Sequence, residues 1–280
     1  MLQLQFGLKR AVTERAAFVM GIVNATPDSF YAESRGGIDR ALQLIDEGAD
    51  ILDIGGESTR PGYTPVSAEE EISRVIPIIQ AVRKVSSIPI SIDTTKLEVF
   101  KSAFAVGADI WNDVTALSGA GKANADGTAC SEAEPSRESA VFIAKSGASV
   151  ILMHSGAGSV SEVSDFLGQR VVFCLANGVS SQKIIVDPGI GFGKTFEQNV
   201  ALIREPLAVC GGRYPVLMAL SRKRCIGEMC ERNPQNSSAE DRLAGTLAAD
   251  LISVQNGSKI IRVHDVSSAI DTLNVMKNLR

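Results

Sequence analysis

Polar and charged side chains follow the short apolar runs of this sequence, at the point where each run ends. They include carboxylates, carboxamides, an ammonium and a guanidinium, in chain order Asn24, Asp93, Asn112, Asp187, Lys223 and Arg262. Carboxylates and asparagines can bind the N–H and C=O groups along the edge of a planar heterocycle. A lysine can lie over the face of such a ring or donate to its acceptors. We therefore expect a pocket for a heterocycle such as an aminopyrimidinone.

A second group of residues is basic and indicates an anion site. Arg60 follows the second apolar run, and Arg262 and His264 belong to the last one. Each guanidinium of an arginine cluster can bind two oxygens of a phosphate at once. Asn24 could offer an oxygen ligand to Mg²⁺, which keeps most of its waters and binds through phosphates. A heterocycle pocket beside a phosphate clamp indicates a reaction in which pyrophosphate leaves a heterocyclic substrate.

Each of these residues also has a simpler explanation. Asp93 and Asn112 could cap the helices that follow them. Asp187 starts an Asp-Pro-Gly turn that would suit any protein, and Arg262 could be a solvated surface base. Their shared place at the ends of successive runs favours one common site, because catalytic residues of barrel enzymes lie at the C-terminal ends of the strands.

Eight runs rich in β-branched residues recur along the chain. Runs that are apolar on both faces are typical of buried parallel strands. We expect these strands at 18–23, 51–54, 88–92, 109–111, 149–153, 183–186, 215–220 and 260–263. Strands that alternate with helical patterns eight times favour a closed (β/α)8 TIM barrel over an open doubly wound sheet.

The segments between the runs have the periodicity of helices. Helices are expected at 38–47, 67–85, 97–106 and 241–254. Ser67 and Glu70 have the spacing of a capping box, and Gly48 and Gly107 are suited to helix C-termini. The Gly-Ala-Asp sequences that precede two of the strands, and Gly-Ala-Ser before a third, are expected to form turns at the end of the barrel opposite the site.

Length and composition are those of an ordinary globular protein. The 280 residues suit one domain, 1–280, with a probable flexible insertion at 119–138, which is small, polar and rich in glycine. A net charge of -4 gives no general attraction for nucleic acid or anionic membranes, and no apolar stretch approaches a membrane span. Five cysteines without a Cys-x-x-Cys pair indicate reduced thiols and a cytoplasmic protein.

Five motifs together resemble the dihydropteroate synthase family, over nearly the whole chain. They are Asn-Ala-Thr-Pro-Asp-Ser-Phe at 24–30, Asp-Ile-Gly-Gly-Glu-Ser-Thr-Arg-Pro-Gly at 53–62, Asp-Pro-Gly-Ile-Gly-Phe-Gly-Lys at 187–194, Ser-Arg-Lys at 221–223 and Arg-Val-His-Asp at 262–265. The resemblance implies a transferase of folate biosynthesis. That family joins 6-hydroxymethyl-7,8-dihydropterin pyrophosphate to p-aminobenzoate, giving 7,8-dihydropteroate and pyrophosphate, and is the target of sulfonamides.

The resemblance also assigns roles to residues. It implies that the pterin lies against Asp93, Asn112, Met153, Asp187, Phe192 and Lys223. It implies that pyrophosphate is held by Asn24, Arg60, Arg262 and His264, with Asn24 on Mg²⁺. For p-aminobenzoate it implies Phe30, Thr59, Pro61, Ser221 and, in place of the usual serine, Arg224. The catalytic residues would be Asp93, Asp187, Lys223 and Arg262, and a homodimer is expected.

Two other functions remain open from the sequence. A related barrel methyltransferase that binds methyltetrahydrofolate would keep the pterin-binding acids but would not need Arg60, Arg262 and His264. A pterin-binding paralogue without catalysis is the second, because the family's usual loop aspartate falls at Ala32, beside Glu33. Release of pyrophosphate that depends on p-aminobenzoate would separate the synthase from both.

Overall fold

The computed structural model describes residues 1–25, 37–57, 65–119, 134–231 and 238–279. Its centre is an eight-stranded parallel sheet with the order β8-β7-β6-β5-β4-β3-β10-β9. The strands are β3 (Phe18–Asn24), β4 (Ile51–Gly55), β5 (Ile90–Asp93), β6 (Ile110–Asp113), β7 (Ser149–Met153), β8 (Ile184–Asp187), β9 (Leu217–Met218) and β10 (Ile260–Val263). A parallel bridge between Val186 and Val216 joins the two ends of the sheet. The expected TIM barrel is therefore confirmed.

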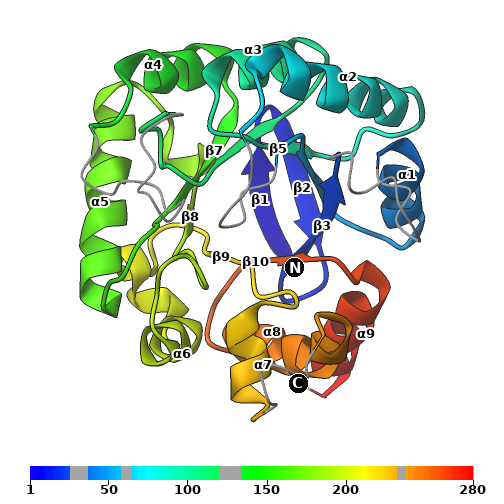
Figure 1. Cartoon of the computed structure of the whole chain (residues 1–280), viewed down its shortest axis with the longest axis vertical. Coiled ribbons are helices and arrows are strands. Elements are labelled where there is room, and N and C mark those ends of the chain that lie inside the picture. Colours follow the sequence, from blue (N-terminus) through cyan, green and yellow to red (C-terminus); the bar gives the residue numbers. More distant parts are fainter. Residues whose placement is uncertain (26–36, 58–64, 120–133, 232–237, 280) are drawn as a thin grey trace.

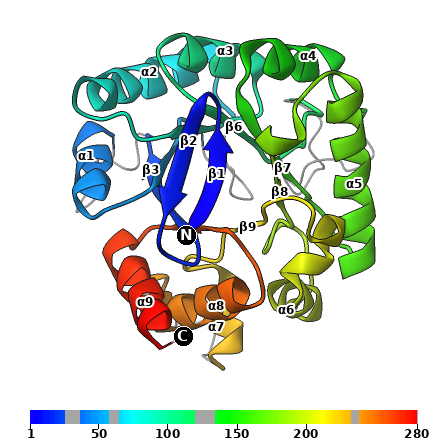
Figure 2. The same ribbon diagram turned by 180° about the vertical axis from the view of Figure 1, so that it is seen from behind.

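Helices surround this barrel on all sides (Figures 1 and 2). They are α1 (Ile38–Asp46), α2 (Ala68–Val85), α3 (Leu97–Ala105), α4 (Arg137–Ser146), α5 (Val160–Ala176), α6 (Phe196–Arg204), α7 (Arg224–Met229), α8 (Leu243–Gln255) and α9 (Val266–Asn278). Each strand buries both faces, one against these helices and one inside the barrel, which explains the continuous apolar runs.

Several expected boundaries differ from the structure by a few residues, and three of the differences concern the later part of the chain. The strand expected at 215–220 is reduced to the two residues of β9. The expected insertion at 119–138 ends earlier, because Ser136 caps α4 and Arg137 and Glu138 are helical. The helix expected from 241 begins as α8 at Leu243, after a 3-10 turn.

The N-terminus of α2 confirms only half of the expected capping box. The hydroxyl of Ser67 accepts a hydrogen bond from the backbone N–H of Glu70, at 3.2 Å. The carboxylate of Glu70 pairs instead with Arg74, one turn further along the helix, at 2.5 Å. Because this carboxylate is engaged by a guanidinium, the reciprocal bond of the box is not made.

A β-hairpin precedes the barrel and was not expected from the sequence. Its strands β1 (Leu2–Phe6) and β2 (Lys9–Thr13) pair antiparallel, and the hairpin lies across the middle of the ring in Figure 2. Phe6 is fully buried and packs edge-on against Phe18, with ring centroids 5.3 Å apart. Phe6 thus joins the apolar layer inside the barrel, and the hairpin closes the N-terminal end of the strands.

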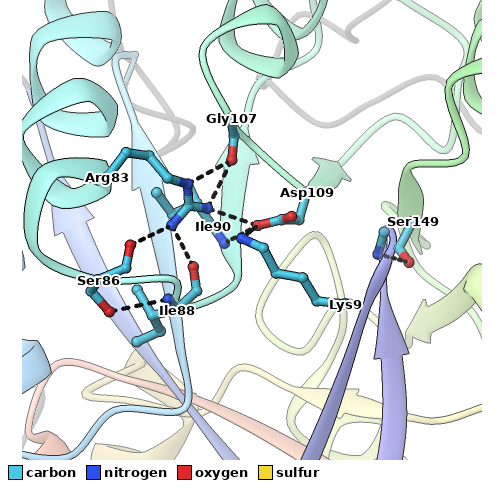
Figure 3. A network of polar contacts seen from close by, with 9 residues as sticks. Lys9, Arg83, Ser86, Ile88, Ile90, Gly107, Asp109 and Ser149 are labelled. Atoms are coloured by element: carbon cyan, nitrogen blue, oxygen red, sulfur yellow. Dashed lines mark hydrogen bonds and ion pairs between the residues drawn. The ribbon is translucent and has the colours of Figure 1, made fainter.

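Polar contacts hold the hairpin in place (Figure 3). The carboxylate of Asp109 binds Lys9 of the hairpin at 2.9 Å, Arg83 of α2 at 2.8 Å and the backbone N–H of Ile90 at 2.9 Å. Asp50 repeats this arrangement with Arg15 at 2.6 Å. The expectation that the Gly-Ala-Asp sequences serve the end opposite the site is confirmed, because both aspartates lie there.

Cys174, Cys210, Cys225 and Cys230 are free thiols, and Cys130 lies outside the described residues. Within the described part of the chain, no helix is long and apolar enough to cross a membrane.

Candidate active site

The C-terminal ends of the strands bring most of the expected pterin residues to one mouth of the barrel. Asp93 ends β5 and is paired in register with Asn112 of β6. Met153 ends β7 and is paired with Asp187, which ends β8. All four residues are buried. Because neighbouring parallel strands end together, the two pairs face the same space at the carboxyl end of the sheet.

Arg262 of β10 reaches across the mouth to two carboxylates. Its Nε donates to Asp53 Oδ2 at 2.6 Å, and its Nη2 donates to Asp93 Oδ2 at 2.9 Å. Asp53 Oδ2 also accepts from Asn112 Nδ2 at 3.1 Å. The sequence did not single out Asp53, because it lies inside β4 rather than at its end. Asp53 is nevertheless the residue that joins Arg262 to Asn112.

This cluster carries unsatisfied acceptors. Asp53 Oδ1 and Asp93 Oδ1 are buried and have no hydrogen-bond partner in the described structure. Burial raises the pKa of Asp93 to about 7, although the positive charge of Arg262 opposes the shift. A buried acceptor without a partner is unfavourable unless a ligand supplies a donor. The mouth is therefore suited to a ligand that presents N–H groups.

Asp187 and Lys223 form the opposite wall of the mouth. Asp187 Oδ1 accepts from the N–H of Gly189 at 2.7 Å. The Nζ of Lys223 donates to the carbonyl of Ile190 and lies 4.7 Å from the ring centroid of Phe192. Burial raises the pKa of Asp187 and lowers that of Lys223 to about 8, each offset in part by the other's charge. Two perturbed groups of opposite charge in one mouth are typical of a functional site.

The loops after β7 and β8 meet around Lys194. Its Nζ contacts His154 Nδ1 at 3.1 Å and the carbonyls of His154, Gly156 and Gly189 at 3.0 to 3.3 Å. Burial, together with Lys194, lowers the pKa of His154 to about 4, and burial lowers that of Lys194 to about 7. His154 directly follows the expected strand at 149–153, and the sequence gave Lys194 no role.

His264 and Ser221 lie on the side of β9 and β10. The hydroxyl of Ser221 is 2.9 Å from His264 Nδ1 and accepts from the backbone N–H of His264 at 3.2 Å. Between Ser221 and Lys223, Arg222 has a φ of 58° and makes two hydrogen bonds to Asp265, at 2.6 and 2.9 Å. These contacts fix the loop after β9 against the loop after β10.

A buried ion cluster supports the loop after β4. The Nζ of Lys96 pairs with Glu57 and, at 2.8 Å, with the fully buried Glu71 of α2. Arg74 of the same helix donates to the carbonyl of Gly56 at 2.6 Å. Burial raises the pKa of Glu71 against the effect of Lys96. Glu57 is the last described residue before the segment with Thr59, Arg60 and Pro61.

The remaining expected residues are not gathered at the mouth in the same way. Asn24 ends β3 with an exposed side chain, beside Gly55 of β4. Arg224 is the first residue of α7, its side chain is 80% exposed, and it pairs with Glu228 at 2.9 Å. Phe30, Thr59, Arg60, Pro61, Ala32 and Glu33 lie outside the described residues.

Comparison with known proteins agrees with this geometry. Residues 20–264 match the family described as pterin binding enzyme. The dihydropteroate synthase of Streptococcus pyogenes is 39% identical, with 96% of this chain and 98% of that protein covered.

Solved structures give the same result. The dihydropteroate synthase of Xanthomonas albilineans with 4-aminobenzoic acid has a TM-score of 0.85 at 38% identity, covering 99% of this chain and 97% of that one. The same enzyme in complex with 7,8-dihydropteroate gives a TM-score of 0.81 at 36% identity, covering 99% and 98%. The chain belongs to the dihydropteroate synthase family of pterin-binding enzymes.

Proposed function

We propose that this enzyme joins 6-hydroxymethyl-7,8-dihydropterin pyrophosphate to p-aminobenzoate, with release of pyrophosphate. The observation that carries the proposal is the presence of two buried carboxylates, Asp93 and Asp187, at the barrel mouth. Asp93 presents a buried oxygen that has no partner among the described residues, and Asp187 lies with Lys223 at the same end of the barrel. The amino and ring N–H groups of a pterin match these acceptors, and its ring acceptors match Asn112 and Lys223.

The same residues suit a dissociative displacement. When the bond between the pterin methylene carbon and the diphosphate oxygen breaks, positive charge spreads into the electron-rich ring. Asp93 and Asp187 are fixed where they stabilise that charge, which is electrostatic preorganisation. The aniline nitrogen of p-aminobenzoate then forms the new C–N bond and loses one proton to water or to the departing diphosphate.

Arg262 has a double role in this proposal. Its guanidinium is bound to Asp53 and Asp93, so it already forms one wall of the pterin pocket. Its nearest strand neighbour is β3, which ends in Asn24. Arg262 therefore lies between the ring site and the expected pyrophosphate site, which Asn24, Arg60 and His264 would complete.

Mg²⁺ fits the residues present. Among the described residues, no group of three or more acidic, histidine or cysteine side chains could hold a metal ion by itself. The exposed carboxamide of Asn24 instead provides a single oxygen, which suits an ion that takes its other ligands from water and diphosphate. When bound, Mg²⁺ would neutralise charge on the leaving diphosphate.

The proposed site for p-aminobenzoate includes residues of the loop after β9. Met153 and Phe192 would line the ring pocket, and Ser221 and Arg224 would lie on the acceptor side with Phe30, Thr59 and Pro61. Arg224 would meet the carboxylate of p-aminobenzoate with a guanidinium whose Nε donates to Glu228 at 2.9 Å. Arg224→Ala should then raise the KM for p-aminobenzoate and leave the KM for the pterin substrate unchanged.

The reaction is tested with the purified protein, the pterin pyrophosphate, p-aminobenzoate and Mg²⁺. Pyrophosphate release that requires p-aminobenzoate supports the synthase, and pterin binding without release favours a paralogue without catalysis. Methyl transfer from methyltetrahydrofolate would favour the methyltransferase. We further propose a cytoplasmic homodimer; the free thiols support the first part, and the concentration dependence of sedimentation tests the second.

A further inference from the structure

The amino group of Lys194 is enclosed by acceptors from two different loops. His154 contributes Nδ1 at 3.1 Å and its carbonyl at 3.3 Å, and Gly156 contributes its carbonyl at 3.2 Å. These residues follow β7. From the loop after β8, the carbonyl of Gly189 lies 3.0 Å away. Three of the four partners of this Nζ in the described chain are carbonyls, so the amino group is held mainly by donating.

The two loops approach each other closely at this point. A Cβ atom on Gly189, whose φ is 71°, would lie 1.8 Å from the carbonyl oxygen of His154. Gly156 N–H donates to the carbonyl of Phe192 at 3.0 Å, and Phe192 N–H donates to Gly189 at 3.1 Å. Carbonyl dipoles that converge in this way repel one another unless a donor lies between them. Lys194 supplies that donor.

The loop after β8 also shapes the pocket. Ile190 accepts the hydrogen bond from Lys223, and Phe192 lies under the same ammonium. Met153 immediately precedes His154 and is paired with Asp187. A displacement of either loop would therefore move the groups that set the position of Lys223 and the wall of the ring pocket.

We propose that Lys194 is a positioning residue, an internal donor that holds the loops after β7 and β8 together and so fixes the pterin pocket. It acts through the loop backbone and has no contact with the reacting atoms. The inference rests on the proposed function, because the pocket is taken to bind a pterin. A lysine that served only to cover the surface would not need to donate to three carbonyls of two loops.

Two substitutions of Lys194 separate a missing donor from a missing volume. Lys194→Ala leaves a space with the shape of n-propylammonium, whereas Lys194→Met fills that space with a side chain that cannot donate. Both variants should bind a pterin ligand such as pteroic acid about tenfold more weakly or worse, since more than one hydrogen bond is lost. The matched control is Lys183→Met, whose Nζ also donates to a carbonyl, that of Gly147, ahead of β7.

The decisive measurement is binding in the presence of n-propylammonium chloride, with tetramethylammonium chloride at equal ionic strength. Propylammonium should restore affinity in Lys194→Ala and leave Lys194→Met unchanged, and tetramethylammonium should restore neither, because it has no N–H. The KM for p-aminobenzoate should change far less than the KM for the pterin substrate.

Three results would overturn the inference. The first is that the folded variants bind pteroic acid with an affinity within twofold of that of the wild type. The second is an equal response to both ammonium salts, and the third is an equal loss in Lys183→Met. If a variant is too unstable for binding measurements, its melting temperature with each salt decides by the same rule. A wild-type protein that fails to bind pterin would refute the proposed function, and the melting comparison would still test the donor role of Lys194.

Discussion

Asp53→Asn should impair the reaction although Asp53 lies beneath the site. Its Oδ2 accepts from Arg262 at 2.6 Å and from Asn112 at 3.1 Å, and the residue is fully buried. The substitution keeps the size of the side chain and removes its charge. Both bonds end on Oδ2, so the asparagine oxygen can still accept both, but it carries no charge and each bond is weaker.

The magnitude follows from those two contacts. A hydrogen bond to a charged acceptor contributes about 1.5–3 kcal/mol and one to a neutral acceptor about 0.5–1.5 kcal/mol, so weakening both bonds by about 1 kcal/mol each costs about 2 kcal/mol. If this loss is expressed in the transition state, it lowers kcat/KM about 30-fold. We expect the decrease in kcat/KM for the pterin pyrophosphate, because Arg262 and Asn112 face that substrate, with the KM for p-aminobenzoate nearly unchanged.

The assay is steady-state release of pyrophosphate, with circular dichroism to show that the variant is folded. Asp50→Asn is the matched control, because Asp50 also binds an arginine, Arg15, and a backbone N–H, that of Val19, but at the opposite end of the barrel. It should lower the melting temperature and leave kcat/KM within about threefold. A folded Asp53→Asn enzyme with kcat/KM within threefold of the wild type would falsify the reasoning. An equal loss in Asp50→Asn would show that the effect is not specific to the site.

Three further substitutions, the last with a control variant, test other features. Asp187→Asn should lower kcat about 100-fold with the fold retained, because the amide oxygen still accepts from the loop backbone but carries no charge; near-normal turnover would contradict the role of Asp187. Asp250→Ala should stabilise the protein by about 1–2 kcal/mol in urea denaturation, because both oxygens of this buried carboxyl lack partners in the described structure. Burial raises the pKa of Asp250 well above its usual range. The wild type therefore loses stability as pH rises from about 4 towards the raised pKa, and the stability advantage of the variant should grow over the same range. An advantage independent of pH would contradict this account of Asp250. Lys96→Met should cost about 3 kcal/mol in the same assay because it leaves the buried Glu71 unpaired. Lys101→Met, which breaks an exposed pair, should cost less than about 1 kcal/mol, and equal losses would contradict the distinction.

The barrel could be predicted because its strands are apolar on both faces and alternate with helical patterns. The hairpin was missed for the opposite reason. Its strands Leu2–Phe6 and Lys9–Thr13 mix polar and apolar residues, and only Phe6 is fully buried in the barrel interior. Nothing local indicates that this segment folds back under the barrel, since its partner Asp109 is 100 residues away from Lys9.

The residues of the site that lie at strand ends could be predicted from the sequence. As the apolar runs indicated, Asp93 ends β5 and Asp187 ends β8. Asn112 is the residue before the last one of β6. Asp53 could not be found in this way, because it lies inside a strand and its role depends on reach across the barrel. The sequence assigned Arg262 to a phosphate clamp, but its carboxylate partners are contributed by strands far away in the chain.

The short strand β9 has a consequence for the stability of the bound enzyme. The sheet is held together between β8 and β9 by a single bridge, so this seam has the fewest backbone hydrogen bonds and should open first in native-state amide exchange. Asp187 ends the strand on one side of the seam, and Lys223 follows the strand on the other. A ligand that binds both residues would link β8 to β9. Ligand binding at the mouth should therefore slow amide exchange in β8 and β9 more than anywhere else in the barrel. The bound substrate would then stabilise the closure of the barrel.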